Sequence, residues 1–218
     1  MSDPHLAALR REYGDRGLDL PDLDDDPITM FRRWLDDAVA AGLHEPNAMV
    51  VATVSSDGRP SARTVLLKGL DTGFVFFTNY ASRKGVELEA NASVALLFPW
   101  HDLQRQVRVE GTASRVSREE SEAYFASRPR ESQLGAWASP QSEVVGSRAA
   151  LDERYGGVLA QFADVVDVPT PPHWGGYRVL PDAVEFWQGR KGRMHDRLRY
   201  RRSEPDAHAP WAVDRLAP

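Results

Sequence analysis

The first clear hydrophobic pattern in the chain is a helical repeat that follows a run of acidic residues. Asp26 is a good helix cap, and Pro27 suits the first turn because its missing amide hydrogen is not needed there. Apolar side chains then recur at three- and four-residue spacing until Gly42, at Phe31, Trp34, Leu35, Ala38 and Val39. The pattern predicts an amphipathic helix that begins at Pro27 and ends before Gly42.

Between residues 49 and 110 the pattern changes to the short runs and alternation that are typical of strands. Ser56-Asp57-Gly58 is a turn signal, and Ser82 is placed to cap a short helix. The apolar or alternating runs between these signals predict five strands, at 49–54, 62–68, 74–78, 93–98 and 104–110.

Helical signals return after residue 116. Ser117 and Glu120 form a capping box that opens a helix. Pro129 must end this helix, which leaves Ser132 in the turn that follows.

The last third of the chain begins with another helical segment. Residues 147–163 look helical, with a break expected at Gly156-Gly157 because glycine is a poor helix former. After a proline-rich connector at 168–172, short apolar runs predict strands near 176–180, 183–188 and 196–201, and residues 211–216 close the chain.

This order of elements predicts the fold class. Six to eight short strands with a few helices between them favour an α+β protein built on an antiparallel barrel over a doubly wound parallel sheet. A chain of 218 residues fits one domain, which we expect at 27–218. Residues 1–26 carry eight acids, three arginines and no sustained apolar period, and therefore predict a flexible or surface-lying arm.

Composition narrows the chemistry by exclusion. The chain has no cysteine, which excludes disulfides and thiolate nucleophiles and suits a cytoplasmic location. No apolar run approaches the length of a membrane span, and the N-terminus lacks the pattern of a signal peptide, so we expect no membrane contact. The net charge of −5 argues against nucleic-acid binding, and six scattered histidines without ligand spacing argue against a metal site. Glycine-rich nucleotide motifs are also absent, so side chains must hold any phosphate.

Arg63 and Lys68 are the first candidate binding residues. They lie five positions apart on the predicted strand 62–68, so their side chains should point to opposite faces. Two such cations can serve two different ligands, or they can be ordinary charges at the ends of a strand.

A second candidate lies at the predicted helix start at Ser82. Free amide groups, a hydroxyl and the cations Arg83 and Lys84 together make a plausible phosphate site. The alternative is a capped helix with basic residues, but cations at the positive end of a helix favour an anion nearby.

A third candidate combines Tyr124, Arg128 and Ser132. Tyr124 and Arg128 are four residues apart and share a helix face, and Ser132 follows shortly after. A phenol, a guanidinium and a hydroxyl can grip a phosphate, although a surface tyrosine with a C-terminal arginine explains the first two residues equally well.

The most basic part of the chain lies between Trp187 and Arg202, where seven cations accompany one acid. Arg193, His195 and Arg197 fall on alternate positions there. Three interpretations of this segment are open: a solvated edge strand, a nucleic-acid patch or an anion-binding site. An anion-binding site also accounts for Trp187 and for the glycines that flank residues 190 and 191.

Read together, these segments resemble the pyridoxine/pyridoxamine 5′-phosphate oxidase family over nearly the whole chain. The stretches that carry the resemblance are Arg10-Arg11-Glu12-Tyr13, Arg63-Thr-Val-Leu-Leu-Lys68, Phe77-Thr78-Asn79, Ser82-Arg83-Lys84, Leu97-Phe98-Pro99-Trp100, Arg105-Gln106-Val107, the segment from Tyr124 to Trp137, Gln141-Ser142, Trp174-Gly175-Gly176, Glu185-Phe186-Trp187-Gln188-Gly189, Arg193-x-His195-Asp196-Arg197 and Asp214-Arg215-Leu216-Ala217-Pro218.

The resemblance implies an FMN-binding split β-barrel, antiparallel and Greek-key-like, that works as a homodimer with its cofactor sites at the subunit interface. It implies oxidation of pyridoxamine and pyridoxine 5′-phosphates by O2. The residues that it implies for FMN are Arg63, Lys68, Phe77, Thr78, Arg83, Lys84, Gln106, Gln141, Ser142, Trp187 and Arg197. For the substrate it implies Arg10, Arg11, Glu12 and Tyr13 in a closing arm, Lys68, Tyr124, Arg128 and Ser132 at the phosphate, and the catalytic pair Arg193 and His195 over the pyridine ring.

Two alternatives stay open from the sequence. A flavin or deazaflavin reductase with the same barrel would act on another substrate, and it should lack the Tyr124/Arg128/Ser132 set that is present here. A carrier of FMN or pyridoxal phosphate would bind without turnover, and Arg193 and His195 argue against it.

Overall fold

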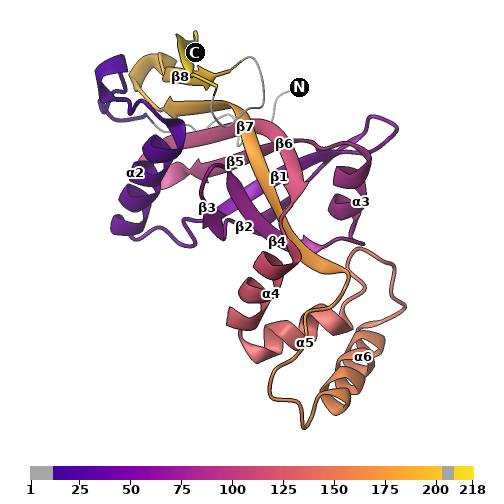
Figure 1. Ribbon diagram of the computed structural model, residues 1–218. Helices are drawn as coiled ribbons and strands as arrows, with labels where there is room; N and C mark the ends of the chain where they lie inside the picture. The colour runs from indigo at the N-terminus through magenta and orange to yellow at the C-terminus, as the bar shows by residue number, and fades with distance from the viewer. Residues whose placement is uncertain (1–11, 203–208) are drawn as a thin grey trace, which may run out of the picture.

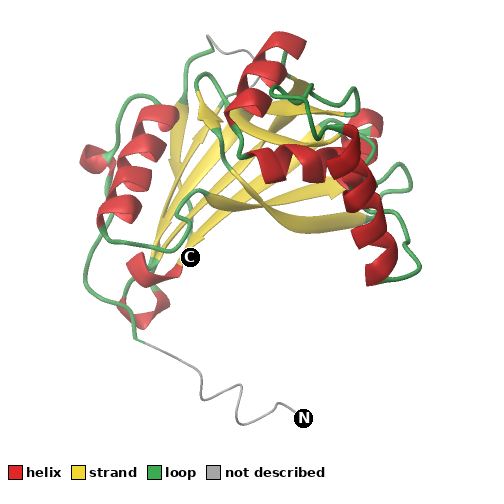
Figure 2. Cartoon of the chain, turned by 90° about the horizontal axis from the view of Figure 1, so that it is seen from below, coloured by secondary structure: helices red, strands yellow, loops and turns green. Residues whose placement is uncertain are grey.

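The computed structural model describes residues 12–202 and 209–218 of the 218-residue chain. In this part of the chain, one antiparallel sheet of nine strands curls around a hydrophobic core and carries helices on its outside (Figures 1 and 2). The expected α+β class and the antiparallel arrangement are therefore confirmed.

The elements follow one another along the chain as the local patterns predict, with some differences in length. The strands are β1 (Ala48–Val54), β2 (Pro60–Leu66), β3 (Gly69–Leu70), β4 (Phe74–Asn79), β5 (Ser93–Trp100), β6 (Arg105–Arg115), β7 (Trp174–Gln188), β8 (Asp196–Arg201) and β9 (Ala212–Arg215). The α-helices are α2 (Pro27–Ala40), α3 (Arg83–Ala90), α4 (Arg118–Ser127), α5 (Arg130–Ala138) and α6 (Arg148–Gln161), and short 3-10 turns are η1 (Leu20–Asp22), η2 (His101–Leu103) and η3 (Lys191–Arg193).

The long strand β7 organises the sheet, and it differs from the prediction of two separate strands. One edge of β7 pairs with β6, while its other edge pairs first with β4, through residues 174–179, and then with β8, through residues 183–188. Strand β7 continues through residues 181 and 182, where a break was expected, because the register between β6 and β7 shifts there opposite Gly111. The two strands approach closely at this point, since a Cβ atom on Gly111 would lie 2.2 Å from the carbonyl oxygen of Leu180. The sheet therefore forks along β7, which crosses the molecule in Figure 1.

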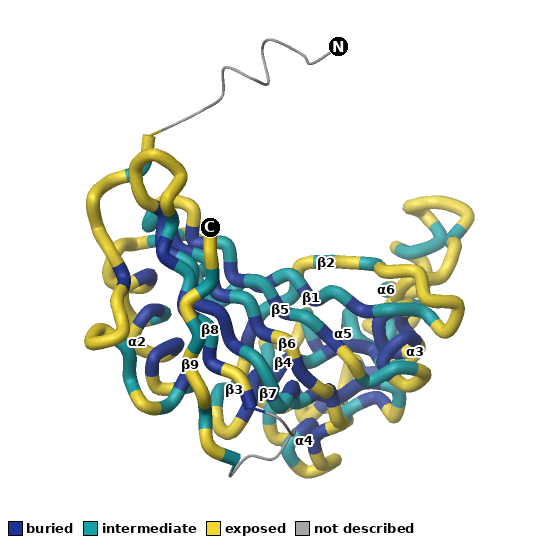
Figure 3. Tube along the Cα trace, turned by 90° about the horizontal axis from the view of Figure 1, so that it is seen from above, coloured by how far each residue is buried: buried dark blue, intermediate teal, exposed yellow. Residues whose placement is uncertain are grey.

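Helix α2 closes the hydrophobic core on one face of the sheet. Asp26 caps the helix through the amide of Thr29, as the sequence predicts. The ring of Phe31 lies 4.9 Å from Phe74 and 4.6 Å from Phe98, measured between centroids, and all three side chains are fully buried. Figure 3 shows this buried centre and the exposed course of the edge strand β2. Burial of this aromatic surface stabilises the packing of α2 on the sheet.

The helices after β6 differ from the prediction in two ways. Ser132 lies inside α5 rather than in a turn, because the chain resumes a helix at Arg130 directly after Pro129, a residue that suits a helix start. Helix α6 runs without a break through Gly156 and Gly157, so the expected break was wrong. Two glycines weaken a helix by about 2 kcal/mol together, which is not enough to interrupt an exposed helix of 14 residues.

Residues 12–26, the described part of the expected arm, lie against the β8–β9 end of the sheet. The amide of Leu18 donates to Asp196 Oδ2 at 3.0 Å, and Leu18 is buried. Asp19 forms an ion pair with Arg215 on β9, and the hydroxyl of Tyr200 donates to the carbonyl oxygen of Asp24. These contacts join the N-terminal segment to the end of the chain.

Candidate functional site

A pocket of about 1000 Å³ opens between the edge strand β2, the end of β4 and the helices α3, α4 and α5. Many of the candidate residues line it, although they come from distant parts of the sequence: Arg63, Lys68, Phe77, Thr78, Arg83, Lys84, Tyr124, Arg128, Ser132, Gln141 and Ser142. Its volume lies at the upper end of the range for small-molecule sites. The fold thus brings together the first three groups of candidate residues.

Arg63 and Lys68 both border this pocket. Strand β2 ends at Leu66, so the alternation that predicts opposite faces does not extend to Lys68. Strand β2 pairs with β1 and lies at the end of the strand order, and residues 61–66 of both orientations line the pocket. The two cations therefore reach one cavity around the free edge of a strand.

Lys84 is held at the pocket wall by neutral oxygen atoms. Its Nζ donates to Gln141 Oε1 at 3.0 Å and to Thr78 Oγ1 at 3.1 Å, and Thr78 in turn donates to Gln141 Oε1. Ser82 caps helix α3 and accepts a third, longer hydrogen bond from Nζ. Burial, together with the charge of Arg63, lowers the pKa of Lys84 to about 8. A nearby anion would raise this pKa again, because it favours the charged form of the lysine.

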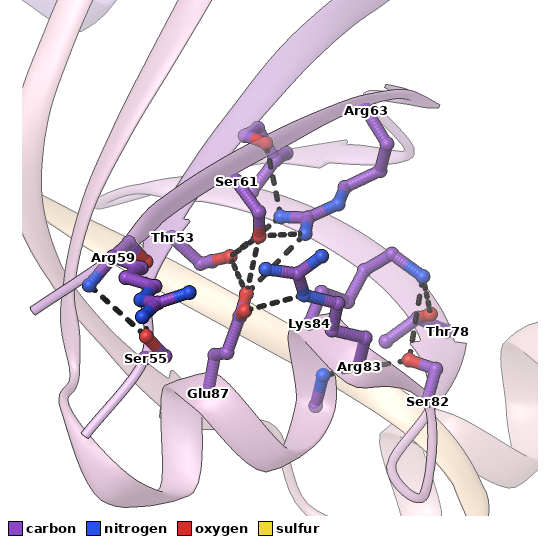
Figure 4. Close-up of polar contacts among 12 residues, drawn as sticks. Thr53, Ser55, Arg59, Ser61, Arg63, Thr78, Ser82, Arg83, Lys84 and Glu87 are labelled. Carbon is purple, nitrogen blue, oxygen red and sulfur yellow. Dashed lines mark hydrogen bonds and ion pairs between the residues drawn. The ribbon is translucent and has the colours of Figure 1, made fainter. Parts of the chain in front are cut away.

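Glu87 is a buried carboxylate behind the pocket, and the sequence analysis did not single it out. Its Oε1 accepts from Arg83 Nε at 2.8 Å, and its Oε2 lies 3.3 Å from Arg63 Nη2 (Figure 4). Ser61 and Thr53 also donate to Oε2. Arg83 and Glu87 are four residues apart on a capped helix, so half of this arrangement is visible in the sequence as a helical ion pair. The contacts across the strands are not.

Tyr124 and Phe77 form the aromatic floor of the pocket with Trp174. The rings of Phe77 and Tyr124 stack at 4.0 Å between centroids, and the ring of Trp174 lies parallel to both. The guanidinium of Arg128 lies 4.7 Å from the centroid of Trp174, and burial lowers its pKa. Tyr124 and Arg128 thus share one wall, as their spacing predicts.

A second group of candidate residues lies on three adjacent strands away from this pocket. Gln106 on β6 is paired in register with Trp187 on β7, and Trp187 is paired with Arg197 on β8. Arg197 makes two hydrogen bonds to Glu185, at 2.7 and 3.1 Å, and one to the carbonyl oxygen of Ala217. The pairing of the three strands therefore places these residues side by side, although Gln106 and Arg197 are 91 positions apart in the sequence.

His195 joins the second group through an aromatic cluster. Its ring lies 4.6 Å from Trp187 and 5.4 Å from Tyr13, centroid to centroid. The amide of Arg190 donates to Nδ1 of His195, so that nitrogen carries no proton and Nε2 carries the hydrogen. Burial and the nearby Arg193 lower the pKa of the imidazole, which keeps it neutral at pH 7.

The basic loop beside His195 is tied to the N-terminal segment. Lys191 pairs with Asp15 at 2.8 Å, and Arg190 pairs with Asp196 at 3.2 Å. Arg193 is exposed, has a positive φ of 62°, and makes no ion pair with a carboxylate among the described residues. Of the two neighbouring cations, Arg190 and Lys191, neither is left free for a ligand.

Within one chain, the pocket and the second group do not form one site. None of Gln106, Trp187, Arg193, His195 and Arg197 lines the pocket. Glu12 is exposed, and Arg10 and Arg11 lie outside the described residues. Of the expected substrate arm, Glu12 and Tyr13 are described, and Tyr13 lies at the aromatic cluster.

The pocket fits a flavin mononucleotide by its chemistry. Three cations converge on one part of the wall: Arg63, Arg83 and Lys84. In the described part of the chain, Glu87 is the only carboxylate that pairs with the two arginines. Elsewhere in the pocket, the buried Nη1 of Arg128 has no hydrogen-bond partner, so an acceptor is expected there. Among residues 12–202 and 209–218, no group of three or more acidic or histidine side chains could hold a metal ion.

The fold and the site together define a class: an antiparallel, forked barrel with a pocket that several cations line. Comparison with known proteins agrees with this class. The family model for pyridoxamine 5′-phosphate oxidase matches residues 35–160, and that for the pyridoxine 5′-phosphate oxidase C-terminal dimerisation region matches residues 174–218. The chain therefore belongs to the pyridoxine/pyridoxamine 5′-phosphate oxidase family, and the resemblance seen in the sequence is confirmed.

Several relatives are similar over nearly their whole length. A pyridoxine/pyridoxamine 5′-phosphate oxidase of Acidothermus cellulolyticus is 61% identical, over 93% of this chain and 90% of its own. The protein of the same name from Rubrobacter xylanophilus is 60% identical, over 98% of this chain and 96% of its own.

Solved structures agree with the fold. PhzG from Burkholderia lata 383, in complex with tetrahydrophenazine-1-carboxylic acid, is 34% identical with a TM-score of 0.83, over 91% of this chain and 95% of its own. A pyridoxamine 5′-phosphate oxidase-related, FMN-binding protein of Nostoc punctiforme shares the fold at 17% identity, with a TM-score of 0.70, over 90% of this chain and 100% of its own. The split barrel expected from the resemblance is the fold of this chain. No described helix has the length and apolarity of a membrane span.

Proposed function

We propose that this protein is an FMN-dependent oxidase that converts pyridoxamine 5′-phosphate and pyridoxine 5′-phosphate to pyridoxal 5′-phosphate. The observation that carries the proposal is one pocket lined by two sets of side chains that are suited to hold a phosphate. One set is Arg63, Arg83 and Lys84, on β2 and α3, and the other is Lys68, Tyr124, Arg128 and Ser132. Two phosphorylated ligands, a cofactor and a substrate, account for both sets. Relatives that are about 60% identical carry the name of this activity.

The substrate phosphate is assigned to the wall formed by α4 and α5. Arg128 can bind two phosphate oxygens with its planar guanidinium, while Tyr124 and Ser132 donate from their hydroxyls. Lys68, which follows the end of β2, adds a point charge. These groups act far from the reacting carbon, so their binding energy serves to position the pyridine ring.

Bound FMN would supply the redox chemistry, in which the substrate loses a hydride from its C4′ carbon and O2 is finally reduced to H2O2; with the amine substrate, water then hydrolyses the substrate imine to the aldehyde and releases NH3. The residues assigned to the substrate ring are Arg193 and His195. Nε2–H of the neutral His195 can donate a hydrogen bond, and Arg193 brings a positive charge that no described carboxylate neutralises. Both groups hold the substrate in a fixed orientation without taking its protons.

The dimer completes the site in this proposal. The second group of residues lies on β6, β7, β8 and the loop before β8, and most of it falls within the segment matched by the family's dimerisation region, which supports a homodimer. We assign Gln106, Trp187, Arg193, His195 and Arg197 of one protomer to the pocket of its partner. Mixed dimers test this: Arg128→Ala and Arg193→Ala protomers, each impaired alone, should form one intact site when combined and so recover part of the wild-type activity at low substrate concentration. No recovery in verified mixed dimers would contradict a shared site.

The activity itself has a direct test. The purified protein should be yellow with bound FMN, and it should form pyridoxal 5′-phosphate and H2O2 from both substrates in air. Yellow protein without product would favour a flavin carrier, and failure to bind FMN would reject the proposal. A phosphate-free carboxylate of the kind bound by PhzG serves as a control substrate, because the Arg128 wall should make it a poor one.

Two further expectations belong to this proposal. A cytoplasmic location is checked by fractionation of the native cells. The division into an arm, residues 1–26, and one domain, residues 27–218, is checked by limited proteolysis, which should cut the arm first, ahead of the segment from Leu18 that packs against β8 and β9.

A further inference from the structure

Glu87 is a carboxylate with four polar partners, and it lies beside the pocket without lining it. It lies in the last turns of α3 with only 5% of its side chain exposed. Burial of an acid is costly, so a buried carboxylate needs partners that stabilise its charge. All of its partners belong to the pocket wall or support it.

The two oxygens of Glu87 hold two different guanidinium groups. Oε1 accepts from Nε of Arg83 at 2.8 Å, and Oε2 lies 3.3 Å from Nη2 of Arg63. Ser61 and Thr53 connect the pair further, because each hydroxyl accepts from Arg63 and donates to Oε2 (Figure 4). The carboxylate is thus the common anchor of both arginines.

The anchoring leaves defined N–H groups for a ligand. Arg83 uses only Nε in this network, so both of its Nη groups stay without a partner among the described residues, on a side chain that is 60% exposed. Arg63 uses both Nη groups, on Thr53, Ser61, Glu87 and the carbonyl of Val51, and keeps Nε. Both arginines line the pocket.

The charges at this wall match a phosphate monoester. Arg63, Arg83 and Lys84 bring three positive charges, and Glu87 brings one negative charge. Burial acts to raise the pKa of Glu87, but the hydrogen bonds from Ser61, Thr53 and Arg83 outweigh it and lower the pKa to about 2, so the acid stays ionised. The net charge of these four side chains is therefore two positive units, which would neutralise the two negative charges of a phosphate dianion.

We propose that Glu87 is a positioning residue for the phosphate of the flavin cofactor, because it fixes the guanidinium groups of Arg63 and Arg83 before the ligand binds. The inference rests on the proposed function and adds a residue outside the pocket to its cofactor site. The advantage of such an anchor is preorganisation: the arginine side chains lose their rotamer freedom on folding rather than on binding.

Glu87→Gln tests the inference, with FMN and riboflavin as probes. An amide has one acceptor oxygen, so either orientation places an N–H group against one of the two arginines. We expect the Kd for FMN, measured by quenching of flavin fluorescence on the apoprotein, to rise about tenfold or more, the effect of losing one charge-assisted hydrogen bond. The Kd for riboflavin, which lacks the phosphate, should change less than twofold. Glu89→Gln, an exposed acid on the same helix that pairs with Arg115, is the matched control and should leave both values unchanged.

Three outcomes overturn the inference. An FMN Kd within twofold of wild type shows that Glu87 positions nothing. Equal weakening of FMN and riboflavin, with a lower unfolding temperature, shows a general structural role. If wild type itself binds FMN no more tightly than riboflavin, the proposed phosphate site fails and the inference fails with it, which the first two outcomes do not imply.

Arg83 offers a second test that does not depend on the folding of a Glu87 variant. Arg83→Lys keeps the positive charge but loses the planar fork. It should raise the Kd for FMN and leave that for riboflavin unchanged, and an unchanged FMN Kd would overturn the inference.

A double-mutant cycle measures the coupling between Glu87 and Arg83. Arg83→Ala should weaken FMN binding less in the Glu87→Gln background than in wild type, because that background has already lost part of the arrangement.

Discussion

The guanidinium of Arg128 lies 4.7 Å from the ring centroid of Trp174, and it pairs with no carboxylate among residues 12–202 and 209–218. The aromatic face holds the cation in place without neutralising it. A side chain arranged in this way is ready for an anionic ligand. The predictions below begin with this residue.

Arg128→Ala should raise KM for pyridoxamine 5′-phosphate by about 30-fold or more, because a bidentate contact to a charged group is lost. Lys68→Ala should also raise KM strongly. Steady-state kinetics check both, with Arg148→Ala as a control, since Arg148 is exposed on α6 and pairs with Asp152. An unchanged kcat/KM for Arg128→Ala would refute the phosphate assignment.

Arg193→Ala should lower kcat as well as raise KM, because its charge is assigned to the substrate ring rather than to the remote phosphate. Arg193 makes no hydrogen bond or ion pair with another described residue, and its backbone has a positive φ, so the unfolding temperature should not fall. A variant with full kcat and a raised KM would show instead that Arg193 stabilises the bound substrate and the transition state equally.

FMN binding should weaken as the pH rises through about 8. Lys84 has a pKa of about 8 in the ligand-free protein, so below this pH it is already charged and binding needs no proton. Above it, the phosphate must draw a proton onto Lys84, and log Kd should climb toward a slope of one per pH unit. Titration of FMN fluorescence from pH 7 to 9.5 measures this. Lys84→Gln should bind more weakly and show a flat profile over the range, and a flat wild-type profile would disagree with the assignment.

Phe31→Ala should destabilise the protein by about 3–5 kcal/mol, since it removes a fully buried ring from the contacts with Phe74 and Phe98. Val39→Ala on the same helix removes an exposed side chain, and it should change stability by less than about 0.5 kcal/mol. Urea unfolding of both variants gives the comparison. Equal effects would mean that α2 does not close the core.

The elements whose signals are local could be predicted from the sequence. Helix α2 follows from its cap and its apolar period, and Ser82 and Ser117 cap α3 and α4 as expected. Most strands lie within two residues of their predicted limits. Such patterns depend on neighbours within one or two turns, which a single sequence contains. The same holds for the ion pair of Arg83 and Glu87, four residues apart.

The tertiary structure decided what depends on pairing between distant segments. The continuity of β7 depends on a bulge opposite Gly111, and the alignment of Gln106, Trp187 and Arg197 depends on the register of three strands. The contact of Glu87 with Arg63 crosses from a helix to an edge strand. The sequence alone pointed to several cations that could bind phosphate, and its resemblance to a family implied a role for each of them. Only the fold placed them around one pocket and put the buried acid behind it, because strand pairing and helix packing, rather than spacing along the chain, set which side chains meet.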